Sequence, residues 1–252
     1  MKKERIEAVA ELLDKRGKLS LAQLCEAFPE VSEMTLRRDL LKLEQENRLI
    51  RIRGGAMSVK EVRKVSGEEY TKKTVINTDQ KRTIARKAAA LIEPGCCMFL
   101  DRGTTAMYLA KEMSDIPCNI FTNGIAVAME LAQKKNAHII LLGGQLLKEN
   151  LSTASPAAKA YLENSNFSIA MISASAFTPE HGFSCSSQIE ADLLRMVRAK
   201  ADTLFMMLDS SKIGKVKPYT FAQIEDLDVL ITDDMFPDDV KEEFKKKNIV
   251  VL

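Results

Sequence analysis

Two kinds of hydrophobic spacing divide the chain. Up to residue 57, apolar residues recur mostly at intervals of three and four, which is the period of amphipathic helices. From residue 79 to the end, short and almost wholly apolar runs alternate with further helical segments. Residues 58–78 lack both patterns and are rich in charged and hydroxyl side chains, so we expect a linker there. The pattern predicts a small domain over 1–57 and a larger one over 79–252.

Three helices are expected in the first domain. The first has an apolar stripe formed by Ile6, Val9, Ala10 and Leu13. Gly17 marks its end, and Ser20 is a suitable cap for a second, short helix that ends at Phe28-Pro29. A third helix starts at Ser32, and its buried stripe consists of Leu36, Leu40 and Leu43.

The outer face of the third helix carries a hydroxyl and several cations, at Thr35, Arg37, Arg38 and Lys42. Arginine suits bidentate contact with guanine in the major groove, whereas lysine more often contacts phosphate. Arg51 and Arg53 then alternate with isoleucines, and Gly54-Gly55 supplies a tight turn. We expect a hairpin that presents both arginines on one face.

Three helices followed by a basic hairpin are typical of a winged helix-turn-helix domain that binds DNA. A basic amphipathic helix alone is more often a solvated surface helix, but the combination favours DNA. The expected contact residues are Ser32, Thr35, Arg37, Arg38, Lys42, Arg51, Arg53, Gly54 and Gly55.

Seven strands are expected in the second domain, at 97–100, 119–121, 138–142, 168–172, 204–208, 229–231 and 249–252. Helices are expected at 84–91, 104–113, 125–132, 157–162, 189–199 and 240–246. Nearly all-apolar strands that alternate with helices indicate an α/β fold, a mostly parallel sheet covered on both faces in a Rossmann-like layout.

Ligands of such sheets bind beyond the carboxyl ends of the strands, and polar residues and glycines follow five of the predicted strands. They are Asp101, Arg102, Gly103, Thr104 and Thr105, then Thr122 and Asn123, then Gly143 and Gly144, then Ser173, and finally Asp209 and Lys212. A helix that begins near Thr104 points free N–H groups at an anion, so we expect a small phosphorylated ligand. Each loop alone is also compatible with an ordinary turn.

Two of these candidates have competing explanations. Lys212 is expected to neutralise the phosphate with Ser210 and Ser211, but a solvated loop lysine is also compatible with the sequence. Glu190, at the start of a helix, is a candidate for binding a sugar hydroxyl, although an acidic residue is favourable there in any case.

Composition narrows the class of protein only moderately. The first 64 residues hold 15 Lys/Arg and 11 Asp/Glu, and the remaining residues hold 22 Lys/Arg and 24 Asp/Glu. The net positive charge therefore lies in the N-terminal part of the chain. Five cysteines without a zinc-type pair are expected to be reduced thiols. His138 and His181 lie outside any recognisable metal pattern, and we expect neither a metal nor another cofactor. No apolar run is long enough for a membrane span, so a cytoplasmic location is expected.

The first domain resembles the DeoR family of bacterial transcription regulators. The matching motifs are Val31-Ser32, Thr35-Leu36-Arg37-Arg38-Asp39-Leu40, Leu43-Glu44 and Arg51-Ile52-Arg53-Gly54-Gly55-Ala56. The second domain resembles the family's C-terminal domain at Asp101, Gly103 to Thr105, Thr122-Asn123, Leu142 to Gly144 and Asp209 to Lys212.

The resemblance implies a second domain similar to ribose-phosphate isomerases, which senses a phosphorylated sugar. It also implies a repressor of carbohydrate-utilisation genes that releases a double-stranded DNA operator when the effector binds. Four positions depart from the family pattern, and these are Arg102, Ser155, Ser173 and Ala176. Arg102 is expected either to bind a second acidic group or to fill part of the pocket.

A second hypothesis belongs to another class of protein. In this hypothesis the second domain is an active isomerase, and the first domain is a DNA-binding appendage. Asp101 or Glu190 would then be the general base of the isomerase. No nucleophile motif supports catalysis, so the regulator is the favoured hypothesis and no enzyme is expected. Helix-turn-helix proteins generally bind paired half-sites, which predicts a homo-oligomer, a dimer or tetramer.

Overall fold

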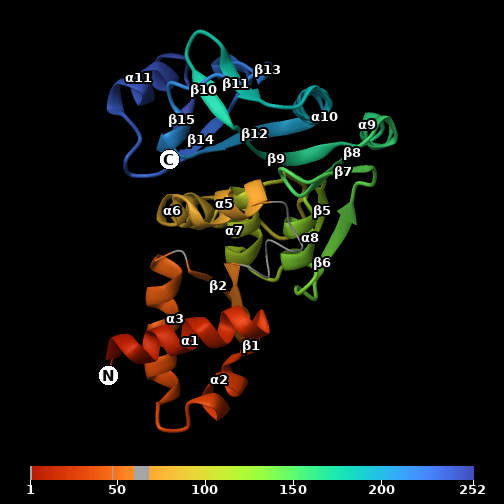
Figure 1. The fold of residues 1–252 in the computed structure, drawn as a ribbon. Helices are drawn as coiled ribbons and strands as arrows, with labels where there is room; N and C mark the ends of the chain where they lie inside the picture. The colour runs from red at the N-terminus through yellow and green to blue at the C-terminus, as the bar shows by residue number, and fades with distance from the viewer. Residues whose placement is uncertain (1, 47, 60–67) are drawn as a thin grey trace. The chain divides into compact units, whose positions relative to one another are not determined.

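A computed structural model describes residues 2–46, 48–59 and 68–252 of the chain (Figure 1). The chain divides into two compact units, Met1–Thr78 and Asp79–Leu252. Of the segment predicted as a linker, residues 60–67 lie outside the described part, and α5 (Glu68–Val75) follows them. Among the described residues, no helix is both long and apolar enough to cross a membrane.

The first unit contains the three predicted helices, α1 (Lys2–Arg16), α2 (Leu21–Ala27) and α3 (Glu33–Gln45). The predicted stripes of α1 and α3 are buried, and with Leu24 of α2 they form one core. The predicted caps are confirmed. Ser20 and Gln23 form a reciprocal capping box at α2, and the Ser32 hydroxyl accepts a hydrogen bond from the Thr35 N–H at 3.3 Å.

Two arginine–carboxylate pairs attach α3 and the turn between α3 and the next strand to α1. Arg5 binds Asp39, a buried residue of α3, with its Nε 2.7 Å from Oδ2. Arg48 donates from both terminal nitrogens to the two carboxylate oxygens of Glu7. Such bidentate pairs fix direction as well as distance, so they set the angle at which α3 presents its outer face.

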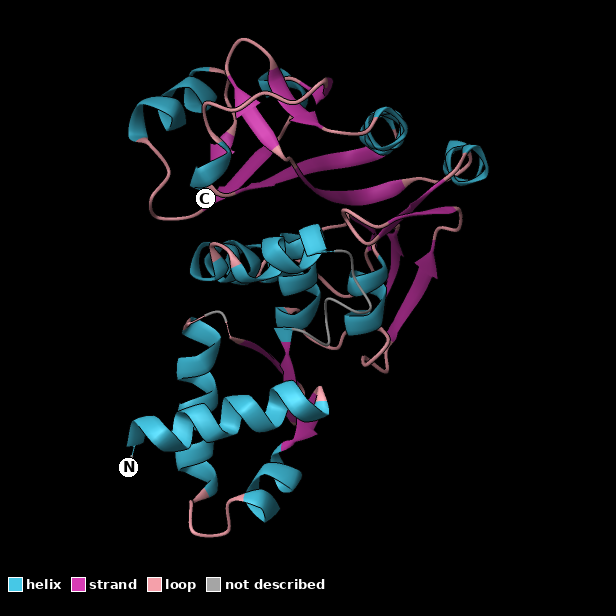
Figure 2. Ribbon diagram, in the orientation of Figure 1, coloured by secondary structure: helices cyan, strands magenta, loops and turns pink. Residues whose placement is uncertain are grey.

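The wing is a three-stranded sheet in the order β1-β3-β2, made of β1 (Lys18–Ser20), β2 (Leu49–Ile52) and β3 (Gly55–Ser58) (Figure 2). The sequence pattern missed β1. The predicted Gly54-Gly55 turn is also wrong by one residue, because Ile52 pairs with Gly55 and the two turn residues are Arg53 and Gly54. Gly54 has φ +77°, which suits glycine.

The second unit is built on a seven-stranded sheet in the order β15-β14-β12-β9-β4-β5-β6, and all neighbouring pairs are parallel. The strands are β4 (Cys97–Leu100), β5 (Cys118–Thr122), β6 (Ala137–Leu141), β9 (Phe167–Ser173), β12 (Ala201–Leu208), β14 (Val229–Thr232) and β15 (Val250–Val251). All seven predicted strands are therefore confirmed, with small changes at their ends.

Helices cover both faces of this sheet, as predicted (Figure 2). Side chains of successive strand residues enter different cores, so that Met98 packs in one cluster and Phe99 in the other. The first core includes residues of α6 (Thr78–Ala89), α7 (Thr104–Glu112) and α8 (Ile125–Leu131). The second includes residues of α9 (Pro156–Glu163), α10 (Gln188–Ala199) and α11 (Asp238–Lys246).

Two small antiparallel elements were not predicted. One is the hairpin of β7 (Gln145–Leu147) and β8 (Ser152–Ala154), and the other is a sheet of β10 (Ala176–Thr178), β11 (Gly182–Cys185) and β13 (Tyr219–Ala222). Their strands have only three or four residues, too few to show a clear alternation of side chains. The β7–β8 hairpin contributes polar groups to the carboxyl edge of the large sheet.

Gly55 is the position in the wing where a side chain is least tolerable. A Cβ atom there would lie 2.1 Å from the carbonyl oxygen of Leu19, so β1 and β3 would have to separate. Gly54 has open space around it and would suffer only backbone strain. We expect Gly55→Ala to lower the free energy of unfolding of the first unit by about 3 kcal/mol or more, and Gly54→Ala by about 1–2 kcal/mol. Calorimetric unfolding of the two variants measures the difference, and equal losses would contradict this account.

Candidate functional sites

The outer face of α3 is exposed at the predicted cations. Arg37, Arg38 and Lys42 are all exposed, and Thr35 is half-buried. The Ser32 hydroxyl lies 2.9 Å from the Thr35 hydroxyl, in addition to capping the helix. The buried leucines on the opposite side hold this face outward, so the predicted division of α3 into a core face and a polar face is confirmed.

The three cations differ in what they contact. Arg37 binds Glu33 one turn earlier at 2.8 Å, and Lys42 lies 3.7 Å from Glu46. Arg38 makes no hydrogen bond or ion pair with any other residue that the structure describes. This difference was not visible in the sequence, where the two neighbouring arginines are equivalent.

The wing arginines also differ. The Nε of Arg51 is 2.7 Å from Oε2 of the buried Glu44, and the backbone N–H of Arg51 donates to Oε1 of the same residue. Arg53 is exposed in the turn. The expectation that both arginines share one strand face is therefore wrong, because the turn takes Arg53 out of the strand. Arg51 attaches the wing to α3, and Arg53 projects from its tip.

In the second unit, the carboxyl edge of the sheet brings together most of the predicted ligand residues. Six of these polar side chains are buried almost completely, namely Asp101, Arg102, Thr122, Asn123, Glu190 and Asp209. Gly143 and Gly144 line a cavity of about 490 Å³ together with Ser155 and Tyr161. Ser173 and Lys212 are half-buried at the same edge.

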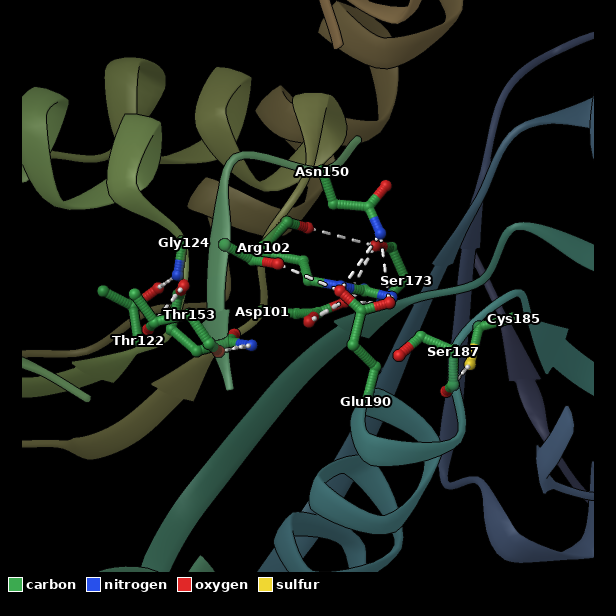
Figure 3. Close-up of polar contacts among 12 residues, drawn as sticks. Asp101, Arg102, Thr122, Gly124, Asn150, Thr153, Ser173, Cys185, Ser187 and Glu190 are labelled. Carbon is green, nitrogen blue, oxygen red and sulfur yellow. Dashed lines mark hydrogen bonds and ion pairs between the residues drawn. The ribbon is translucent and has the colours of Figure 1, made fainter. Parts of the chain in front are cut away.

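Arg102 is the centre of a buried hydrogen-bonded network (Figure 3). Its Nε and Nη2 donate to the two carboxylate oxygens of Glu190 at 2.6 and 2.7 Å, and its Nη1 donates to Asp101 at 3.2 and 3.3 Å. Asp101 also accepts from the backbone and the hydroxyl of Ser173. Arg102 is thus engaged by two carboxylates of its own chain, and both expectations for its role toward a ligand stay predictions.

Glu190 is held by two further residues that the sequence analysis missed. Asn150 donates to both of its carboxylate oxygens at 3.0 Å, and the Ser152 hydroxyl donates to Oε1 at 2.9 Å. Both belong to the β7–β8 hairpin and its tip. The only signal in the sequence was a short run of polar residues between the third and fourth predicted strands.

The network shifts the ionisation of its acids in opposite directions. Burial alone would raise the pKa of Glu190, but the hydrogen bonds and charge of Arg102 hold it below its ordinary value. Burial raises the pKa of Asp101, and the charge of Arg102 opposes this rise only in part. Burial alone would lower the pKa of Arg102, but the two carboxylates raise it above its ordinary value, so this side chain stays a cation.

The start of α7 supplies backbone N–H groups beside this network. Gly103 precedes the helix with φ +94°, and Thr104 and Thr105 are its first, buried residues. Asn123 donates from Nδ2 to the carbonyl of Thr153 at 3.2 Å, while its buried Oδ1 has no hydrogen-bond partner among the described residues. Turning the amide over would place its oxygen against that carbonyl, so the assigned orientation is favoured. An unpaired buried acceptor suits a ligand hydroxyl.

Asp209 and Lys212 form a separate polar group after β12. Asp209 accepts hydrogen bonds from the backbone N–H and the hydroxyl of Ser211, and the Lys212 Nζ lies 3.6 Å from its Oδ2. The distance is that of a loose ion pair rather than a hydrogen bond. The ammonium group can therefore bind another anion without losing a close contact.

Comparison with known proteins adds independent information. Two family models match the chain, the DeoR-like helix-turn-helix domain at residues 5–62 and the DeoR C terminal sensor domain at residues 76–234. The HTH-type transcriptional regulator YulB of Bacillus subtilis is 35% identical over 91% of this chain and 88% of its own length. The lactose phosphotransferase system repressor of Streptococcus mutans is 35% identical over 92% of both chains. The HTH-type transcriptional repressor GlcR of Bacillus subtilis is 33% identical over 91% and 88%.

Among solved structures, ribose 5-phosphate isomerase A of Methanocaldococcus jannaschii is similar over 54% of this chain and 55% of its own. The TM-score is 0.39 and the sequence identity 16%. This similarity is too low to support an argument about activity. Among the residues that the structure describes, no group of three or more His, Cys, Asp and Glu side chains is placed to hold a metal ion.

Arg102 compensates two buried carboxylates, and its removal would leave both without a partner cation. We expect Arg102→Met to lower the free energy of unfolding at pH 7 by about 3–5 kcal/mol. Because the pKa of Glu190 is lowered in the folded state, its stabilising contribution is present above the pKa of the unfolded chain and is lost as the pH falls through the folded value. The variant lacks this contribution, so its deficit should shrink as the pH falls from 7 to about 3, chiefly below the ordinary Glu pKa of 4.5.

Differential scanning calorimetry across that pH range checks this expectation. The double variant Arg102→Met/Glu190→Gln removes one of the two carboxylate charges that lack a cation in Arg102→Met. It should therefore recover part of the lost free energy of unfolding at pH 7. Arg86→Met, at an exposed position of α6, is the matched control and should change the free energy of unfolding by less than about 0.5 kcal/mol. A deficit that is independent of pH would contradict the electrostatic explanation.

Proposed function

The chain belongs to the DeoR family of transcription regulators, and we propose that it represses carbohydrate-utilisation genes and leaves its operator when a phosphorylated sugar binds. The observation that carries this proposal is the exposed cationic face of α3 on a three-helix scaffold with a wing. The names of the similar proteins support repression, since two of them are a lactose phosphotransferase system repressor and the repressor GlcR.

On DNA, α3 is the helix that enters the major groove. Arg38, whose side chain makes no hydrogen bond or ion pair with other described residues, is the candidate for bidentate contact with guanine. Lys42 and the wing residue Arg53 are suited to phosphate contacts. Ser32 and Thr35 place hydroxyl groups at the start of α3, and Gly54 and Gly55 let the wing backbone approach the sugar-phosphate chain closely.

The effector site is the carboxyl edge of the large sheet. The phosphate binds the N–H groups at the start of α7, at Gly103 to Thr105, and the ammonium of Lys212. The unpaired Oδ1 of Asn123 accepts a hydrogen bond from a sugar hydroxyl. Glu190 already has both carboxylate oxygens engaged, so it positions Arg102 rather than binding the sugar directly.

The same contacts argue against isomerase activity. A general base needs a carboxylate that can accept a proton from the substrate, and both Asp101 and Glu190 are bound to Arg102. The chain therefore acts as a sensor and not as an enzyme. It binds operator DNA as a homo-oligomer, since helix-turn-helix proteins bind paired half-sites, and it acts in the cytoplasm.

Release by the effector has a thermodynamic requirement. A ligand shifts the equilibrium between two conformations only to the extent that it binds one of them more tightly. The sugar phosphate must therefore prefer the conformation that binds DNA weakly, and operator DNA must weaken effector binding by the same factor.

The two arginines of α3 should affect DNA binding differently. We expect Arg38→Ala to reduce specific binding by about 1–3 kcal/mol and to leave binding to random DNA almost unchanged, because it removes a base contact. Arg37→Ala should weaken both by similar factors, because Arg37 is paired with Glu33 and contributes mainly to the electrostatic potential. Fluorescence anisotropy with operator and random duplexes at fixed salt measures the ratio of the two affinities.

Arg16→Ala, at an exposed position at the end of α1, is the charge-matched control for both variants. It should reproduce neither effect. A specificity ratio that falls equally for Arg37→Ala and Arg38→Ala would contradict the assignment of Arg38 as the base-contacting residue.

Lys212 should be required for the response to the effector and not for DNA binding. A thermal-shift panel of triose, pentose and hexose phosphates identifies the ligand, and operator release is then titrated with it. We expect Lys212→Ala to bind operator like the original chain and to need at least tenfold more effector for release, because one charge-assisted contact to phosphate is lost. Lys215→Ala, in the exposed loop three residues on, is the control. Loss of operator binding in folded Lys212→Ala would contradict this division of roles.

A further inference from the structure

An exposed methionine lies within the cationic face of α3. Met34 is the second residue of the helix and is 61% exposed. Exposed apolar residues are common on protein surfaces and usually need no explanation. Met129 of α8, which is 62% exposed, is an ordinary example. Met34 differs because of the side chains that surround it.

Helix geometry places Met34 directly opposite the buried stripe of α3. At 3.6 residues per turn, Met34, Arg38 and Leu41 fall within about 60° of one another around the helix axis. Leu36, Leu40 and Leu43 occupy the other side, and all three are buried. Leu41 is 37% exposed on the outer face. The centre of the face is thus one free arginine flanked by apolar side chains, with Arg37 and Lys42 on its two sides.

Base edges in the major groove match this combination of side chains. Guanine presents two acceptors for an arginine, and thymine presents a 5-methyl group, which is the only apolar substituent in the groove. The first residues of a recognition helix are those that reach base edges. Methionine is unbranched and polarizable, so its terminal methyl can adjust to a small apolar partner.

We propose that Met34 contacts the 5-methyl group of a thymine in the operator, next to the guanine contacted by Arg38. Met34 and Arg38 are four residues apart, which is about 6 Å along the helix. Stacked bases are separated by about 3.4 Å, so the thymine lies within about two base pairs of the guanine. This inference rests on the proposed function and extends it from the presence of an operator to a feature of its sequence.

Removal of single methyl groups from the DNA tests this contact. Full-length protein is used to select binding sequences from a random duplex pool, and each thymine of the selected site is replaced singly by deoxyuridine. Affinities are measured by fluorescence anisotropy at fixed salt. We expect one thymine at which loss of the methyl weakens binding about fourfold, as burial of one methyl group predicts.

The protein variants assign that effect to Met34. In Met34→Ala, binding should be weaker, and the deoxyuridine substitution at that thymine should change the affinity by less than about 1.5-fold, because the partner of the methyl is gone. Met34→Leu should keep the methyl dependence. Met129→Ala, equally exposed in the other unit, should behave like the original chain. Because position 34 is on the surface, unfolding of these variants is not expected, and calorimetry verifies it.

Two negative results have different meanings. Selective binding in which no thymine methyl matters, or in which Met34→Ala keeps the methyl dependence, overturns the contact and leaves the repressor function intact. If the protein selects no preferred DNA sequence, the proposed function is overturned, and the proposed contact of Met34 is overturned as well.

Discussion

The ion pairs of the buried Arg102 guanidinium with Asp101 and Glu190 are the interactions on which the polar carboxyl edge of the large sheet depends. A buried cation of this kind loses its hydration, and only close carboxylates with further donors of their own can replace that hydration. Glu190 meets the condition because Asn150 and Ser152 bind the same carboxylate, and Asp101 meets it through Ser173. The loop after β4, the β7–β8 hairpin and the start of α10 are therefore joined by one cluster of charges.

This cluster also decides how a ligand can be recognised. Two carboxylates at a sheet edge are good acceptors for sugar hydroxyls, but here both are bound to a cation of the same chain. The groups that remain available are the N–H groups at the start of α7, the Asn123 oxygen and the loosely paired Lys212. They favour an anion accompanied by a hydroxyl. In the effector site proposed above, Arg102 thus favours recognition of phosphate over recognition of hydroxyl groups.

The sequence was sufficient for most helices and for the seven strands of the large sheet, and it placed most candidate ligand residues at one edge of that sheet. Stripes such as Leu36 and Leu40 follow the helical period, and the apolar strands follow their own, so both were predicted correctly. Arg102 was identified as unusual, but Asn150 and Ser152, which bind its partner Glu190, were not, because pairing across about 40 positions leaves no periodic signal. The turn at Arg53 was misplaced because two adjacent glycines fit a turn equally well, and only the close approach of Gly55 to Leu19 settles the register. The contact residues of both sites remain predictions.

The energies of the ion pairs determine which arginines of the first unit are available to DNA. The pair of Arg37 and Glu33 is exposed on both sides, and pairs of this type on a helix contribute only about 0.3–0.5 kcal/mol. A hydrogen bond from a charged donor to a DNA phosphate is worth about 1.5–3 kcal/mol, so DNA can separate Arg37 from Glu33. Arg51 is different, because its partner Glu44 is buried, and breaking a pair with a buried carboxylate costs more than breaking an exposed one. Arg51 thus attaches the wing to α3. On α3 itself, Arg38 has no ion pair with a described residue, and the neighbouring Arg37 has only a weak one. In the proposed complex with DNA, the wing then fixes where α3 meets the groove, Arg38 makes the base contact, and Arg37 supplies an adjustable charge.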